Sequence, residues 1–137
     1  MNIHTIAQHL TALLGESTTG LNFIAQPIEG DVDVLQVTVE GREEIPVFVS
    51  VTDDQVLCVS YLWGVDEVKS ECVAEMHASM LEMNIPIPLS SFSKIGDKYA
   101  VFGALSTNSS FDDIEREIAV LSSNSLDVIN DMSDYLV

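Results

Sequence analysis

Apolar residues recur every three or four positions at the start of the chain: Ile3, Ile6, Leu10, Leu13 and Leu14. An α-helix repeats about every 3.6 residues, so this spacing places the five side chains on one face of a helix of about three turns. Gly15 is a suitable residue to cap the end of that helix. Residues 17–20 are small and polar, which indicates a loop.

The pattern then changes to the β-branched and alternating apolar residues that are typical of strands. Four segments show it: 21–26, 32–39, 47–51 and 56–62. Pro27 ends the first segment, and Asp53-Asp54 between the last two suits a tight hairpin turn. Another turn is expected at residues 41–44. The four segments predict an antiparallel meander of three or four strands.

Helical spacing returns after Gly64 and predicts a second helix. One face of this helix carries Val65, Val68, Cys72, Met76, Met80 and Met83. A different face carries Glu67, Glu71, Glu75 and Glu82. Asn84 ends the helix, and Pro86 and Pro88 prevent its continuation. A methionine stripe of this kind fills a core more often than it forms an adaptable binding groove, so we predict that it is buried.

Two further strands and a third helix complete the predicted fold. The strands are residues 89–95 and 99–105. Gly96-Asp97 between them is a hairpin signal. The third helix begins near Ser110, and its apolar face carries Ile114, Ile118, Leu121, Val128, Met132 and Leu136. The serine and asparagine run at 122–125 has weak helix propensity, which leaves open whether this helix is continuous.

The predicted order of elements is therefore α-βββ(β)-α-ββ-α. It defines a single α+β domain over residues 1–137, with an antiparallel sheet packed by helices. The first residues lack the basic segment and continuous apolar run of a signal peptide, and no stretch approaches the roughly 18 apolar residues of a membrane span. We therefore expect a cytoplasmic protein.

Composition excludes several classes of partner. The 137 residues include 22 acidic and 5 basic side chains, which give a formal net charge of -17, yet 47% of the residues are hydrophobic. Such a chain has enough apolar material for a core and is not a disordered acidic tail. Its five bases stand singly along the sequence, whereas nucleic-acid binding needs clustered Lys and Arg. We expect no nucleic-acid binding and no direct binding to anionic membranes.

Two segments are almost free of charge and predict a protein-binding surface. Residues 1–28 hold one acid and no base, and residues 85–92 are apolar and uncharged. Interface cores are depleted of charge, and aromatic residues often anchor them. The candidate contact residues are Ile6, His9, Leu10, Leu13, Trp63, Ile87 and Phe92. The alternative is that both segments are buried within the monomer.

No motif in the chain predicts a reaction. Cys58 and Cys72 lie among apolar residues and are expected to fill the core. The three histidines, His4, His9 and His77, lack the spacing of a metal site. With 22 acids, a pair of carboxylates at any given separation is expected by chance, so we nominate no general acid or base. We expect no catalytic residue, no metal and no cofactor.

The element order, small size and acidic composition resemble the fold of type III secretion chaperones. The segments IPVFVSVTDDQVLCVSYLW (residues 45–63) and KYAVFGALS (residues 98–106) are similar to the YjfI-like group of small acidic bacterial proteins. The chaperone resemblance implies a cytoplasmic homodimer that captures an extended segment of a protein partner along the first helix and the sheet. Neither resemblance supplies catalytic residues.

Two other functions compete with a protein-binding, chaperone- or adaptor-like module. Glu67, Glu71 and Glu75, in line on an acidic helix, would let the chain imitate nucleic acid and inhibit a basic protein. The second competing function is an enzyme that uses carboxylates, with or without a divalent metal, although no spacing supports it.

Overall fold

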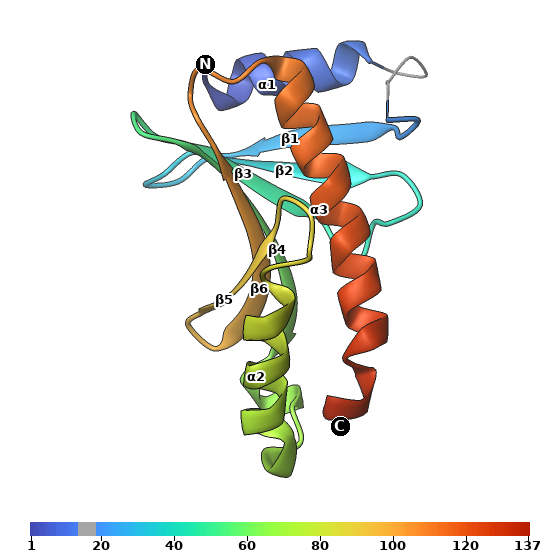
Figure 1. Cartoon of the computed structure of the whole chain (residues 1–137). Helices are drawn as coiled ribbons and strands as arrows, with labels where there is room; N and C mark the ends of the chain where they lie inside the picture. The colour runs from blue at the N-terminus through green and yellow to red at the C-terminus, as the bar shows by residue number, and fades with distance from the viewer. Residues whose placement is uncertain (14–18) are drawn as a thin grey trace.

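The computed structural model describes residues 1–13 and 19–137 and contains one six-stranded antiparallel sheet (Figure 1). Its strands are β1 (Phe23–Ile28), β2 (Val34–Val39), β3 (Val47–Val51), β4 (Val56–Gly64), β5 (Ser91–Ile95) and β6 (Lys98–Leu105). They lie in the order β1-β2-β3-β4-β6-β5, so the first four strands form the predicted meander. The expected hairpin turns at Asp53-Asp54 and Gly96-Asp97 are confirmed.

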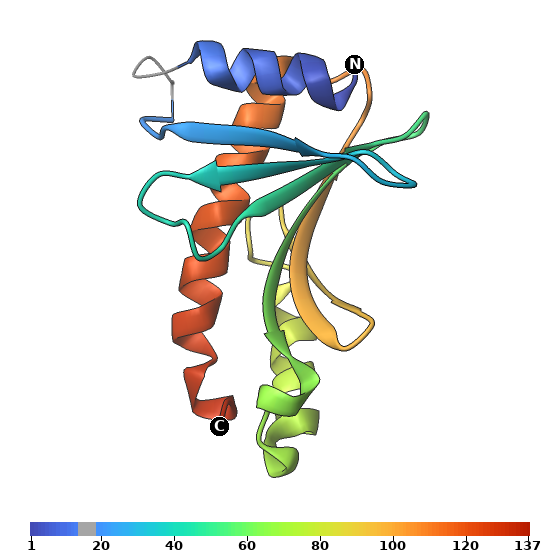
Figure 2. The ribbon, with the colours of Figure 1, turned by 180° about the vertical axis from the view of Figure 1, so that it is seen from behind.

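Three helices accompany the sheet: α1 (Ile3–Ala12), α2 (Val73–Met83) and α3 (Phe111–Asp131). Helix α1 lies along β1, and α3 crosses the same face of the sheet (Figure 1). Seen from behind, the strands lie in front of α3 and no helix covers them (Figure 2). The sheet therefore has one face packed by helices and one open face, and the predicted α+β architecture is confirmed.

The ends of α1 and α3 follow from capping side chains. Asn2 Oδ1 accepts a hydrogen bond from the backbone N–H of Thr5 at 3.0 Å, and the Asn2 N–H donates to Thr5 Oγ1 at 3.2 Å. Ser110 Oγ accepts from the N–H of Asp113 at 3.1 Å, as its position in the sequence predicts. The expected cap at Gly15 lies outside the described residues.

Strand alternation and helical spacing build the main core between α1, α3 and the sheet. Inward-facing strand residues meet the apolar faces of both helices, and the buried set includes Ile6, Leu10, Leu35, Val37, Val47, Val49, Val101, Ile114, Ile118 and Leu121. Burying each such aliphatic side chain contributes about 1.5–3 kcal/mol relative to leaving it exposed. The apolar face of α1 is therefore buried in the main core, and the uncharged residues of this helix lie on its other faces.

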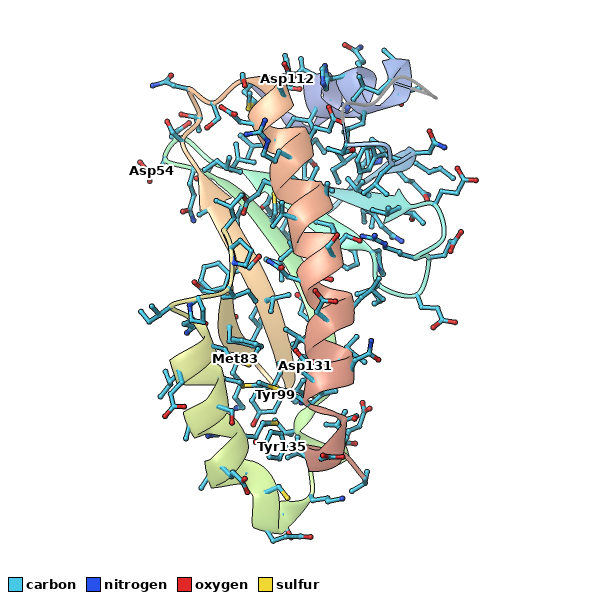
Figure 3. The ribbon with its side chains drawn as sticks, turned by 45° about the vertical axis from the view of Figure 1, so that its right-hand side comes forward. Asp54, Met83, Tyr99, Asp112, Asp131 and Tyr135 are labelled. Atoms are coloured by element: carbon cyan, nitrogen blue, oxygen red, sulfur yellow. The ribbon has the colours of Figure 1, made fainter. Side chains whose placement is uncertain are left out.

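A second core lies where α2 meets the C-terminal part of α3. It contains Trp63, Val68, Met76, Met80, Tyr99, Val128 and Met132, with Met83 and Tyr135 partly buried against them. Figure 3 shows Met83, Tyr99 and Tyr135 between these two helices. Met76 and Met80 are buried, so the prediction that the methionine stripe fills a core is confirmed for these two residues.

The second helix begins at Val73, and the prediction that it begins just after Gly64 is wrong. Residues 65–72 form two 3-10 turns around Val68, which forms a β-bridge with Leu136. The Lys69 N–H donates to the Tyr135 carbonyl at 2.8 Å. Long-range pairing with the C-terminal segment thus replaces the helical hydrogen bonds that the local periodicity predicted.

Helix α3 is continuous through the serine and asparagine run because partners outside the helix bind its polar groups. Arg42 donates to Ser122 Oγ at 3.2 Å and to Ser123 Oγ at 3.0 Å. Asn124 donates to the Pro88 carbonyl at 2.8 Å. The helix ends at Asp131, so Leu136, which was expected on its apolar face, lies beyond it.

Close contact between α3 and β6 depends on Gly103. A Cβ atom at this position would overlap Glu117 Oε1 and lie 3.0 Å from the Leu89 carbonyl oxygen. Glu117 is buried between α3 and the sheet, so its carboxyl has little room to move aside. A side chain at position 103 would have to displace this carboxyl and press on the Leu89 backbone.

We predict that Gly103→Ala lowers the free energy of unfolding by about 1–3 kcal/mol through overpacking. The matched control is Gly30→Ala, where the nearest atom to an added Cβ is 3.7 Å away, and the change there should stay within about 0.5 kcal/mol. Urea denaturation followed by circular dichroism measures both. Equal effects at the two glycines would contradict the packing argument.

Candidate functional site

The open face of the sheet lacks acidic residues along its strands. The strand register places on it Ile24, Gln26, Ile28, Val34, Gln36, Thr38, Phe48, Ser50, Leu57, Val59, Tyr61, Ser91, Ser93, Ile95, Lys98, Ala100, Phe102 and Ala104. Among these described strand positions, Lys98 is the one charged side chain. In a chain of net charge -17, an exposed face of this composition points to an interaction surface.

A hollow of about 440 Å³ lies on this face, and we call it the sheet trough. Its walls are Ile28, Val34, Phe48, Ser50, Leu57, Val59, Tyr61 and Ile95. Ile28 belongs to β1 and Ile95 to β5, the two edge strands, so the sheet curls enough for its opposite edges to line one hollow. Figure 2 shows the bend in β4 and β6 that produces this curl.

Two aromatic rings stand in the trough. Phe48 and Tyr61 contact each other edge to face, with ring centroids 5.8 Å apart, and Tyr61 is exposed. Aromatic side chains give a large apolar contact area for little loss of conformational freedom, and they dominate the binding energy of many protein interfaces. These two residues are the strongest candidates for anchoring a partner.

A smaller hollow of about 280 Å³ separates α2 from β5. It is lined by His77, Met80, Leu81, Asn84, Phe92, Ser93, Lys94 and Tyr99. His77 Nε2 and Tyr99 Oη are 2.8 Å apart, and Asn84 Oδ1 accepts from the Phe92 N–H at 2.7 Å. Side-chain hydrogen bonds therefore already occupy much of the polar surface of this hollow, and the sheet trough is the larger site.

The structure does not bring the seven predicted contact residues together in one surface. Ile6 and Leu10 are each 1% exposed and belong to the main core, and Leu13 is partly buried against it. Trp63 is buried in the second core, where Ile87 and Phe92 are partly buried. Helical spacing identified an apolar face correctly but does not distinguish a core face from an interface.

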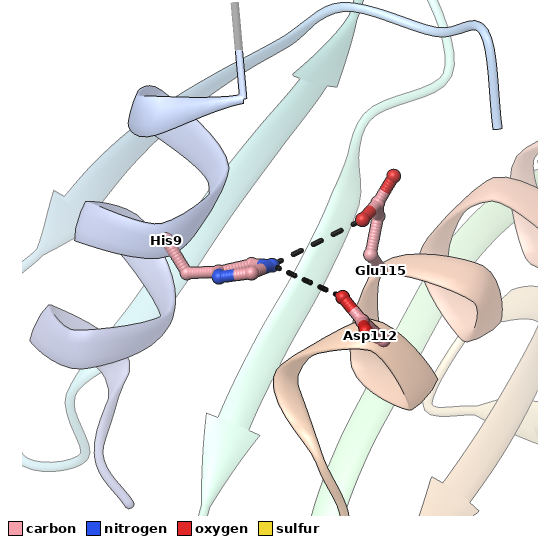
Figure 4. A group of neighbouring side chains, drawn as sticks. All are labelled: His9, Asp112 and Glu115. Atoms are coloured by element: carbon pink, nitrogen blue, oxygen red, sulfur yellow. Dashed lines mark ion pairs between the residues drawn. The ribbon is translucent and has the colours of Figure 1, made fainter. Parts of the chain in front are cut away.

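His9, the remaining predicted residue, faces α3. Its Nε2 atom lies 3.9 Å from both Asp112 Oδ1 and Glu115 Oε2 (Figure 4), and its ring stacks on Phe111 with centroids 5.1 Å apart. Protonated His9 thus forms an ion pair that joins α1 to the start of α3. The donor atoms of these three residues lie within 4.8 Å of one another, and they are of types that bind divalent cations. The absence of a bound metal stays a prediction.

Two buried ionisable groups face each other on the packed side of the sheet. Desolvation raises the pKa of the Cys58 thiol to about 12, and the nearby charge of Glu117 adds to the effect. Desolvation also raises the pKa of the Glu117 carboxyl, and Glu117 Oε1 has no hydrogen-bond partner among the described residues. Both pKa shifts result from enclosure of the two groups between α3 and the sheet. The raised pKa keeps the Cys58 thiol protonated, and a protonated thiol is a poor nucleophile.

Glu117 gives a pH-dependent prediction. A raised pKa in the folded state means that burial favours the neutral carboxyl, so its stabilisation is fullest below the unfolded pKa and is lost as the pH rises through the folded pKa. We expect Glu117→Gln to be increasingly more stable than the parent protein as the pH rises from about 4 to about 7. Thermal melts across that range measure the difference. For exposed Glu82, the Glu82→Gln curve should run parallel to the parent curve, and a parallel curve for Glu117→Gln would contradict the prediction.

No helix within the described ranges has both the length and the apolar character needed to cross a bilayer.

Sequence comparison identifies the family. The family model DUF2170, described as "Uncharacterized protein conserved in bacteria", matches residues 3–136, so the chain belongs to that family. No curated protein has a detectably similar sequence.

Two solved structures share the fold at low sequence identity. YbjN from E. coli, described as a proposed transcription regulator, is 14% identical with a TM-score of 0.56, and the match covers 93% of this chain and 94% of YbjN. A chain of the ExsC–ExsE complex is 12% identical with a TM-score of 0.54, and the match covers 91% of this chain and 92% of that one. These likenesses show that the chain shares its overall fold with YbjN and with that chain of the ExsC–ExsE complex.

Proposed function

We propose that this member of the DUF2170 family is a non-enzymatic protein-binding module, chaperone- or adaptor-like, whose sheet trough binds a segment of a protein partner. The observation that carries the proposal is the open sheet face, which is apolar and free of acidic residues in a chain with 22 acids. Exposed apolar surface favours association, and acidic side chains would normally interrupt it. The described acids lie at turns and on helices instead, which leaves the face free for a partner.

The open face is a better binding site than either edge of the sheet. At one edge, β1 contains Pro27, which lacks a donor, and α1 lies along this strand. At the other edge, the outward N–H of Phe92 is already bonded to Asn84. Lys94, two residues further on, presents the next outward N–H. Strand addition would therefore find few free backbone groups, and side-chain burial in the trough has to supply most of the affinity.

The structural neighbours support this proposal at the level of the fold. The fold occurs in a chain of the ExsC–ExsE complex, where two different proteins are bound to each other. The same proposal includes an extended partner segment, a homodimeric state, a cytoplasmic location and the narrower relation to YjfI-like proteins.

Mimicry of nucleic acid receives less support from the geometry. Glu67 and Glu71 lie in separate 3-10 turns, and α2 begins only at Val73. The expectation that Glu67, Glu71 and Glu75 stand in line on one helix is therefore wrong, and the regular acidic row that would imitate phosphates is absent from this segment.

We predict that Phe48→Asp or Tyr61→Asp lowers partner capture at least tenfold, because either change places a charge in the trough. Tagged protein and host lysate, compared at low and high salt by quantitative mass spectrometry, give the measurement. The control is Ile85→Asp, since Ile85 is 89% exposed and lies outside the trough. A partner captured equally by all folded variants would refute the trough as the binding site.

A further inference from the structure

We infer that the segment bound in the trough carries Lys or Arg at one end, and that this basic end lies against the β1–β2 and β3–β4 turns. The inference rests on the proposed function and adds the chemistry and orientation of the partner. It follows from the unequal charge at the two ends of the trough.

One end of the trough is strongly acidic. The row of Ile28, Val34, Ser50 and Leu57 crosses the sheet next to the two turns. The turns carry five exposed carboxylates: Glu29, Asp31, Asp33, Asp53 and Asp54. Figure 3 shows Asp54 at the tip of the β3–β4 turn. Neither turn contains a basic residue.

Both turns meet at this end of the sheet. Asp33 from the β1–β2 turn and Asp53 from the β3–β4 turn line one hollow with His4, Ile3 and Val51, on the α1 side of this sheet end and next to the trough. A protonated His4 would bring one positive charge against the five carboxylates, so this end keeps a net negative charge.

The opposite end of the trough is nearly balanced. Lys98 is the register partner of Ile95, which lines the trough there, and Lys94 lies on the same hairpin. The acids nearby are Asp97 in the hairpin turn, and Asp66 and Glu67, whose side chains lie close to Gly64. This hairpin thus holds two lysines beside three carboxylates, with Lys98 on the open face and Lys94 on the packed face. The turn end carries the larger negative charge, so a positively charged segment end is attracted there instead.

A second copy of the chain is a poorer occupant than a basic segment. It would bring a further formal charge of -17 towards the first copy, including the same acidic turns. Like charges raise the free energy of association, and salt screens that repulsion. A homodimer through the trough should therefore strengthen as salt rises, whereas binding of a basic-ended segment should weaken.

The test uses synthetic fluorescent peptides that share one apolar sequence and end in a cluster of three Lys, three Ser or three Glu. Each cluster is placed at the N-terminus in one peptide and at the C-terminus in another, which gives six peptides. We expect one Lys-ended peptide to bind about tenfold more tightly than its Ser-ended counterpart at low salt, and the Glu-ended peptide to bind most weakly. Fluorescence anisotropy measures the dissociation constants of all six peptides at low and high salt. The advantage of the Lys-ended peptide should shrink as salt rises.

Matched variants locate the effect. Replacing Asp33, Asp53 and Asp54 by Asn should bring the Lys-ended peptide to the affinity of the Ser-ended one. The control removes the same number of charges elsewhere, through Glu75→Gln, Glu82→Gln and Asp127→Asn, and should preserve most of the difference. Equal loss in both triple variants would mean that net charge alone acts, and would overturn the inferred orientation.

The remaining outcomes separate this inference from the proposed function. If the Lys-, Ser- and Glu-ended peptides bind equally and Phe48→Asp abolishes binding, the trough is the site and the basic-end inference is wrong. If no peptide binds, or if binding survives Phe48→Asp, the trough is not a peptide site and both fail. A dimer that forms as salt rises and excludes the peptides would identify the second copy as the occupant and overturn the inference.

Discussion

Helix α3 crosses the sheet and takes part in both hydrophobic cores, so its packing joins the two ends of the molecule. Ile114, Ile118 and Leu121 lie in the main core, while Val128 and Met132 lie in the second. Such contact requires a close approach between helix and strand, since dispersion attraction falls away within an ångström of extra separation. Gly103 provides that approach, and the enclosed carboxyl of Glu117 is its electrostatic cost.

This packing also determines which surface remains for binding. Helices α1 and α3 lie on one face of the sheet, and α2 extends beyond its end to meet α3. No helix is left to cover the other face, where strand alternation nevertheless places Phe48, Leu57 and Val59. An uncovered sheet face is usually kept soluble by charged side chains on the face itself. Here the described carboxylates lie at turns and on helices instead, which keeps the molecule acidic while the centre of the face stays apolar.

Much of the fold could be predicted because its signals are local. Asp53-Asp54 and Gly96-Asp97 mark turns through their own conformational preferences, and Ser110 caps α3 with its own side chain. The start of the second helix was predicted wrongly because a distant segment decides it, through the pairing of Val68 with Leu136. The continuity of the third helix was left open by its own sequence, and hydrogen bonds from distant Arg42 support the continuous form.

The candidate site could not be predicted in the same way because a helical stripe and a strand pattern carry different information. Ile6 and Leu10 belong to an apolar stripe that any core-packed helix would show. The stripe alone therefore could not tell whether these residues are buried in the core or contact a partner. For strands, the useful signal is in the outward positions. Gln36, Thr38 and Ser50 are polar but uncharged where a solvated sheet face usually carries charge, and reading those positions together would have indicated an unusual face.

A binding face and a binding edge lead to different kinds of recognition. Backbone groups at an edge accept many sequences, because every extended chain offers the same donors and acceptors. In this structure Pro27 and α1 restrict one edge, and the bond between Asn84 and Phe92 restricts the other. Under the proposed function, selection of a partner would then depend on its side chains, through the shape of the apolar trough and the charge of its rim. A module of this kind would suit one kind of segment, and its acidic turns would act before contact by drawing oppositely charged residues towards one end.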